Sequence, residues 1–159
     1  MATTLGEVLN GRDTISTKDA TVYLTINGQN IPLIECNELT VKLEKNKEDV
    51  QVLGNHWKKK KVTSVEGTGT LGGYLINSIW AKYGIPYTDE QADLYMDLVF
   101  NIEDKTSEAG KQTIHLGQVN LDDVPIVDFK ADDDVMQWES DFTFEEIDLV
   151  QEFDGKFKV

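Results

Sequence analysis

Residues 38–73 read ELTVKLEKNKEDVQVLGNHWKKKKVTSVEGTGTLGG. Apolar and polar side chains alternate over residues 39–44, and residues 62–71 are rich in Thr, Val and Gly, so the sequence predicts a strand at each end of this stretch. The polar segment between the two strands, residues 46–61, contains the lysine run Lys58–Lys61. Neighbouring strands in a compact domain are usually joined by only about 2–5 residues. A connection this long, which we call the arm, needs a reason, and we expect it to contact a neighbouring copy of the chain.

Alternation with a period of two recurs along the chain and predicts further strands with one dry and one wet face. These patterns cover residues 22–33 (with the turn signal Asn27-Gly28), 91–103, 114–119, 121–129 and 135–147. The patterns at 91–103 and 135–147 are each about a dozen residues long, which predicts strands of about 40 Å. Strands of that length suit a wall that lines a channel or continues into a neighbour's sheet, and an ordinary long hairpin is the alternative.

One amphipathic helix interrupts the strands. Five large apolar residues fall on one face at helical spacing and are followed by a stop signal of Gly84 and Pro86; they are Leu75, Ile76, Ile79, Trp80 and Tyr83. The sequence therefore predicts a mainly β fold, an antiparallel β-sandwich or partial barrel with one flanking α-helix. The length of 159 residues fits a single domain over residues 1–159.

The excess negative charge lies in the second half of the chain. Residues 1–88 carry 10 basic and 9 acidic side chains, whereas residues 89–159 carry 5 basic and 20 acidic ones. The densest positive cluster lies in the arm. This asymmetry suits an arm that docks on an acidic patch of a neighbour, and simple solubility is the alternative.

The compartment is predicted from features that the sequence lacks. No apolar run approaches the roughly 20 residues of a membrane-spanning helix, and the N-terminus has no secretory signal pattern. Cys36 is the one cysteine, so the chain cannot form an internal disulfide. Together these features favour a cytoplasmic origin.

Catalytic and metal-binding signals are weak, so we predict no enzyme activity, no cofactor and no metal site. His56 and His115 sit in no cluster with ligand spacing, and His115 is expected on a wet strand face. The glycine-rich residues 67–73 lack the Gly-Lys-Ser/Thr ending of a phosphate loop. Residues 132–134, three aspartates, lack the spacing of a calcium loop and favour a solvated turn.

Nucleic-acid binding is suggested only by the lysine run. The net charge of −14 would repel phosphates, and Arg12 is the one arginine available for base readout. We therefore expect no sequence-specific contact with nucleic acid.

The arm and the C-terminal strand resemble a known family. Residues 44–50 (EKNKEDV), Leu53-Gly54, the lysine run and residues 67–70 (GTGT) are similar to the tail tube proteins of PBSX-like prophages. That family belongs to contractile phage tails and to phage-tail-like (R-type) bacteriocins. Residues 141–148 (DFTFEEID) resemble its closing strand, and the likeness runs from about Asn10 to the end of the chain.

The resemblance implies a structural protein rather than an enzyme. Hexameric rings would stack into a hollow tube with an acidic lumen that DNA can cross, and a contracting sheath would drive the tube through a cell envelope. The expected partners are other copies of the chain and the sheath, tape measure, baseplate and tail terminator proteins. The expected location is a virion or bacteriocin tail, assembled in the bacterial cytoplasm.

Residues can be assigned to this role from the sequence. The arm would contact the adjacent subunit or ring through Asn46, Lys47, Glu48, Asp49, Val50, Trp57, Lys58, Lys59, Lys60 and Lys61. Asp93 and Asp97, on predicted wet strand faces, are candidates for the lumen wall.

A monomeric β-sandwich that binds a carbohydrate or a cell-surface ligand is the alternative function. Trp57, Trp80 and Trp138 would then serve as stacking platforms. Trp80 and Trp138 fall on predicted dry faces and are expected in the core, which leaves only Trp57 for such a role.

Overall fold

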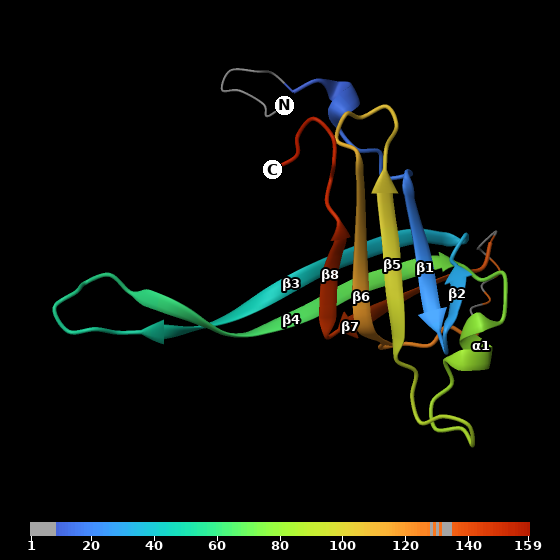
Figure 1. Cartoon of the computed structure of the whole chain (residues 1–159). Coiled ribbons are helices and arrows are strands. Elements are labelled where there is room, and N and C mark those ends of the chain that lie inside the picture. Colours follow the sequence, from blue (N-terminus) through green and yellow to red (C-terminus); the bar gives the residue numbers. More distant parts are fainter. Residues whose placement is uncertain (1–8, 128, 130, 132–134) are drawn as a thin grey trace. The chain divides into compact units, whose positions relative to one another are not determined.

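The chain folds into two compact units in a computed structural model that describes residues 9–127, 129, 131 and 135–159. The first unit comprises residues 1–35, 95–119 and 146–159, and the second comprises residues 36–94 and 120–145. Eight strands and one short α-helix lie within the described residues (Figure 1). The predicted mainly β, antiparallel fold with one helix is confirmed. The assignment of the whole chain to a single domain stays a prediction.

The first unit is an antiparallel sheet with the strand order β2-β1-β5-β6-β8. Its strands are β1 (Ala20–Ile26), β2 (Gln29–Pro32), β5 (Met96–Glu103), β6 (Lys111–Leu121) and β8 (Glu146–Gln151), and a 3-10 turn, η1 (Gly11–Asp13), precedes them. Asn27 and Gly28 join β1 to β2 with φ angles of 51° and 80°, the left-handed values that a two-residue hairpin turn requires. The predicted hairpin is therefore confirmed.

The dry face of this sheet is built from residues that pair across strands. Leu24 lies opposite Leu98, and Leu98 lies opposite Leu116; all three are fully buried. A register shift follows, because Met96 pairs with Val119 and β6 gains one residue where Gln118 adopts a φ of 55°. This bulge explains why Leu116 and Val119 are three positions apart and yet both buried.

The second unit has the strand order β3-β4-β7, and the last two residues of β6 pair with β7. Its strands are β3 (Cys36–Val50), β4 (Lys59–Tyr74) and β7 (Gln137–Phe144), and its helix is α1 (Ile79–Tyr83). Figure 1 shows β3 and β4 running together as one long, twisted hairpin. These two strands contain 15 and 16 residues, against a usual mean of about 5–6.

Strand lengths differ from the sequence prediction. The patterns at 91–103 and 135–147 contain β5 and β7, which have only 8 residues each, so the prediction of 40 Å strands there is wrong. The chain bends at Glu145. Strand β7, which buries Phe142 and Phe144, ends before this bend, and a separate strand, β8, follows it.

Residues 121–129 were predicted to form a short strand. Among the residues described there, only Leu121 belongs to a strand. The Asp122 N–H donates to the Asp141 carbonyl (2.8 Å) and the Asp123 N–H donates to Ser140 Oγ (3.0 Å), so β7 holds the start of this connection. The ladder with β7 stops there, and the chain continues without strand pairing through Pro125.

The helix is shorter than predicted. Leu75 does not belong to it, because its N–H donates to the Met136 carbonyl (3.1 Å) as an extension of the sheet, and Ile76 is exposed. The Ile79 N–H donates to Asn77 Oδ1 (3.2 Å) at the first turn of α1. As predicted, the helix ends at Gly84, whose N–H donates to the Trp80 carbonyl (2.8 Å).

The core of the second unit is aromatic. Trp80 of α1 and Trp138 of β7 meet edge to face, with ring centroids 5.1 Å apart, which confirms that both belong to the core. Phe142 and Phe144 of β7 lie over Gly69 and Gly67 of β4, where there is no side chain to obstruct the rings. The Gly-Thr repeat therefore serves close packing of sheet and rings.

We predict that Gly69→Ala destabilises the chain. An added Cβ would lie 2.3 Å from the Thr40 carbonyl oxygen and 2.4 Å from the Phe142 ring, so strand and ring must move apart. The expected loss is about 1–3 kcal/mol or more in urea unfolding. Gly11→Ala is the control, because a Cβ there meets nothing within 4 Å. Equal unfolding midpoints for the two variants would refute this packing account.

A second stability prediction concerns Asp104, a buried carboxylate after β5. Its Oδ1 accepts hydrogen bonds from Thr106 Oγ1 (2.7 Å) and the Thr106 N–H (2.9 Å), and its Oδ2 accepts one from the Ser16 N–H (2.9 Å). These bonds, the Thr106 hydroxyl foremost, hold the pKa of Asp104 below its ordinary value of 3.8. The carboxylate therefore stabilises the fold above that pH, and the contribution is lost as the pH falls through the lowered pKa.

Asp104→Asn should consequently lower the urea concentration at the unfolding midpoint at neutral pH. The difference in midpoint between the variant and the unmodified chain should become smaller when the pH falls below 3.8, the ordinary pKa of the group. The exposed Asp89 provides the control substitution, Asp89→Asn. A gap that stays constant from neutral pH down to about pH 3 would show that ionisation of Asp104 contributes nothing.

Candidate self-association surfaces

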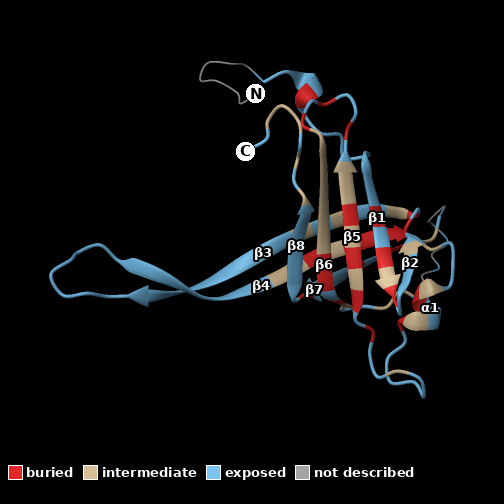
Figure 2. Cartoon of the chain, viewed as in Figure 1, coloured by how far each residue is buried: buried red, intermediate tan, exposed pale blue. Residues whose placement is uncertain are grey.

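The arm is the outer part of the β3–β4 hairpin rather than a loop. Strands β3 and β4 stay paired as far as Val50 and Lys59, and only residues 51–58 form a loop. The prediction that the whole arm is an unpaired connection between the two strands is therefore wrong. The pairing is reinforced on the surface, since Asn46 Nδ2 donates to Ser64 Oγ (2.9 Å). Opposite charges also lie across the ladder, as Glu48 pairs with Lys61. Figure 2 shows that this part of the hairpin is exposed throughout.

An apolar stripe runs along one face of the hairpin beyond the core. Gly67 and Gly69 face the rings of Phe144 and Phe142, so this is the dry face of the sheet. Leu43, Val62 and Val65 continue the same face, since Leu43 pairs with Gly67, Val65 is two residues further along β4, and Val62 follows after a register shift at Thr63. We call these three residues the apolar stripe. Their exposed fractions are 50%, 40% and 55%.

The lysine run divides into two pairs. Lys58 Nζ and Lys60 Nζ lie 3.1 and 3.4 Å from the Asp49 carboxylate, and hydrogen bonds from these two ammonium groups, Lys58 first, lower the pKa of Asp49. Lys59 and Lys61 make no ion pair with any described residue. The assignment of all four lysines to a contact with a neighbour stays a prediction, and two of them also pair with Asp49.

The tip of the hairpin presents apolar side chains to solvent. Leu53 is fully exposed and Trp57 is 84% exposed. Gly54 turns the chain with a φ of 81°, and the Trp57 N–H donates to Asn55 Oδ1 (2.9 Å), which fixes the backbone at the tryptophan. Large exposed apolar side chains at the end of a long, ordered hairpin indicate a contact surface.

The first unit has its own exposed apolar edge at β8. Ile147 and Leu149 pair with Leu116 and Ile114, so they extend the dry face of that sheet, yet they are 41% and 58% exposed. The ladders recorded for β8 join it only to β6 within the described residues, which leaves its outer edge unpaired. Exposed edges of this kind are normally covered or blunted.

The two candidate lumen residues lie in different settings. Asp93 precedes β5 rather than lying on it, and its carboxylate accepts hydrogen bonds from the Leu94 N–H (2.8 Å) and from Asn120 Nδ2 (2.9 Å). Asp97 does lie on β5, with Oδ2 3.7 Å from Nε2 of His115. His115 Nδ1 is 3.5 Å from Asp148 Oδ2, so this half-buried histidine bridges two carboxylates. The lumen assignment of both aspartates stays a prediction.

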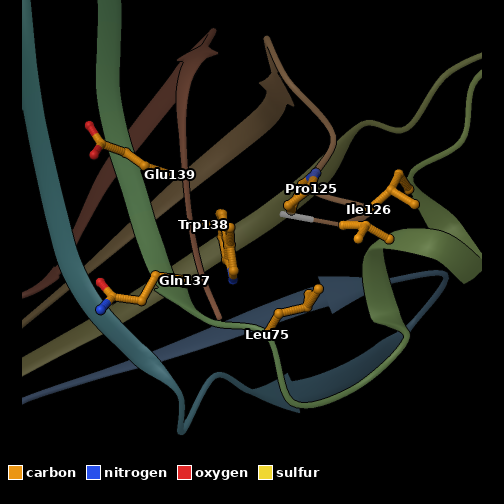
Figure 3. A pocket seen from close by; sticks show the side chains of 7 residues that line it. Leu75, Pro125, Ile126, Gln137, Trp138 and Glu139 are labelled. Atoms are coloured by element: carbon orange, nitrogen blue, oxygen red, sulfur yellow. The ribbon is translucent and has the colours of Figure 1, made fainter. Parts of the chain in front are cut away.

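A pocket lies beside Trp138 in the second unit, with a volume of about 140 Å³. It is lined by Leu75, Pro125, Ile126, Val127, Gln137, Trp138 and Glu139. Figure 3 shows the Trp138 indole between Leu75 and the pair Pro125 and Ile126, while the side chains of Gln137 and Glu139 point away. Trp138 Nε1 is buried and has no hydrogen-bond partner among the described residues.

Neither a metal cluster nor a membrane-spanning helix was found in the described part of the chain. No three His, Cys, Asp or Glu side chains there are placed to hold a metal ion, and no helix there is long and apolar enough to cross a bilayer. The aspartates at 132–134, predicted to form a solvated turn, lie outside the described residues.

The apolar stripe and β8 were missed in the sequence. Residues 62–71 were predicted as a strand without a strongly apolar face, because the register shift at Thr63 places Val62 and Val65 three positions apart and hides their common face. β8 was merged with β7, although the apolar positions move from even numbers (Phe142, Phe144) to odd ones (Ile147, Leu149). This change from even to odd apolar positions indicates two separate strands.

Comparison with known proteins identifies the family. Residues 7–151 match a family described as "Phage tail tube protein". The phage-like element PBSX protein XkdM of Bacillus subtilis (strain 168) is 30% identical over 149 residues, which cover 94% of this chain and 99% of that protein.

Solved structures share the fold. A chain of the anti-feeding prophage baseplate matches with a TM-score of 0.59 and 12% identity, covering 88% of this chain and 94% of the other. A chain of the sheath–tube complex of the extracellular contractile injection system PVC matches with a TM-score of 0.59 and 12% identity, covering 86% and 93%. The family match over most of the chain, together with the full-length relative, shows that this protein belongs to the phage tail tube protein family.

Proposed function

We propose that this tail tube protein forms hexameric rings that stack into the hollow inner tube of a contractile tail or a phage-tail-like bacteriocin. Sheath contraction would drive that tube through the envelope of a target cell. The observation that carries the proposal is the apolar stripe, Leu43, Val62 and Val65, on an ordered hairpin. A monomer gains nothing from exposing this stripe, whereas a second copy that covers it removes apolar surface from water.

Charge supports contact between copies. The arm carries Lys59 and Lys61 without ion pairs to described residues, whereas residues 89–159 carry 20 acidic and 5 basic side chains. Opposite charges on two surfaces of one chain favour head-to-tail contacts, in which the arm of each copy meets a different surface of the next. Such contacts close into a ring when the rotation between copies permits it.

Six-fold symmetry and the partners are proposed by analogy with structures of the same fold. The anti-feeding prophage baseplate is described as six-fold symmetrised, and the PVC structure is described as a sheath–tube complex. We accordingly propose a sheath protein around the tube and a baseplate at one end, with tape measure and terminator proteins as further partners. By the same analogy we propose that the protein is located in a virion or bacteriocin tail.

The polar face of the β3-β4-β7 sheet is the surface that we propose for the lumen wall. This face is opposite the one that packs on Phe142 and Phe144, and it carries five acidic side chains and one basic side chain: Glu38, Glu44, Glu66, Glu139, Asp141 and Lys42. An acidic wall would repel the phosphates of DNA in transit and so prevent binding. This surface carries more acidic side chains than the pair Asp93 and Asp97.

The proposal predicts that shortening the hairpin yields a folded chain that cannot polymerise. Lys45 pairs with Val65, so replacing residues 46–64 with a two-residue Asn-Gly turn would close the hairpin at that pair. We expect an unchanged core and loss of tubes, measured by urea unfolding and by negative-stain electron microscopy over a concentration series. A shortened chain that forms normal tubes would refute a role for the arm in assembly.

Point substitutions test the apolar stripe separately. Val62→Ser with Val65→Ser should raise the protein concentration needed for tube formation by about tenfold or more, because two exposed valines no longer gain from burial at the contact. The control is Ile34→Ser with Ile85→Ser, which removes two exposed apolar side chains outside the hairpin. Light scattering against concentration measures the threshold. Equal thresholds for both double variants would remove the stripe from the contact.

A further inference from the structure

We propose that Trp57 at the tip of one copy's arm inserts into the pocket beside Trp138 of another copy. The inference rests on the proposed function, because it names the surface that receives the arm. It makes the contact specific, since an aromatic anchor would enter a preformed pocket.

The inserting side chain is already positioned for such a contact. Trp57 is 84% exposed, and its backbone is fixed by the hydrogen bond from its N–H to Asn55 Oδ1. Tryptophan is enriched among the few residues that dominate binding energy at protein interfaces, typically where it fills a pocket on the partner. A backbone that is ordered before binding loses less conformational entropy when the contact forms.

The pocket has the size and chemistry for one aromatic side chain. A cavity of about 150 Å³ in another protein admits a benzene ring, and this open pocket is of similar size, about 140 Å³. Five of its seven lining residues are apolar, with Leu75, Pro125 and Ile126 near the Trp138 ring.

Charge favours a second copy of this chain as the occupant. Residues 51–61 contain the lysine run Lys58–Lys61 and no acidic residue, whereas the pocket wall and the described residues just before it include Asp122, Asp123 and Glu139. Oppositely charged surroundings would steer the tip toward the pocket before the tryptophan enters it.

Disulfide trapping tests the contact without removing the anchor. In a Cys36→Ser background, His56→Cys places a thiol next to Trp57, and Val127→Cys places one on the exposed pocket wall. Mild oxidation of the assembled protein should give a ladder of covalent oligomers on a denaturing gel. Adding Trp57→Ala should reduce the ladder at least tenfold. Moving the second thiol to the exposed position 90, with Glu90→Cys, should give no ladder.

The outcomes separate this inference from the proposed function. Tubes without a ladder would overturn the pocket assignment and leave the tail tube proposal standing. A crosslink confined to the monomer would mean that the tip occupies its own pocket and would also overturn the inference. A chain that forms neither tubes nor a ladder at any concentration would overturn both.

Discussion

The β3–β4 hairpin has a dry face that is longer than the core covering it, and the proposed assembly depends on this mismatch. Near the base, Phe142 and Phe144 cover the glycines of β4. Beyond Gly67 the same face continues as the apolar stripe, which the described residues leave about half exposed. Continuous strand pairing keeps the hairpin ordered out to Val50, so the stripe is presented as a surface rather than collapsed. A second copy of the chain can cover this surface and remove its apolar side chains from water.

The charges on the hairpin favour contacts with acidic surfaces. Lys58 and Lys60 share an ion pair with the single carboxylate of Asp49 within the arm, so the lysine run keeps a net positive charge. The acidic half of the chain then repels other acidic surfaces and attracts the tip. The apolar contacts would supply most of the free energy of association, and the charges would select which surfaces meet.

Much of the fold and the position of the arm could be predicted from the sequence, because both follow from patterns of neighbouring residues. Alternation over short stretches gave β1, β5, β6 and β7, and Asn27-Gly28 gave the first turn. The rest depends on pairing between distant residues. His115 lies between Asp97 and Asp148 only because β5, β6 and β8 are neighbours. The extent of β3 and β4 was also hidden, because charged residues at 47–49 and 59–61 pair as strands without an alternating apolar signal.

Cryo-electron microscopy of the polymerised protein would show whether a neighbouring copy covers the apolar stripe. We expect a hollow tube with six-fold symmetry in which Leu43, Val62 and Val65 are buried against another copy. A tube in which these side chains face solvent would contradict the proposed assembly, as would a chain that remains monomeric at every concentration.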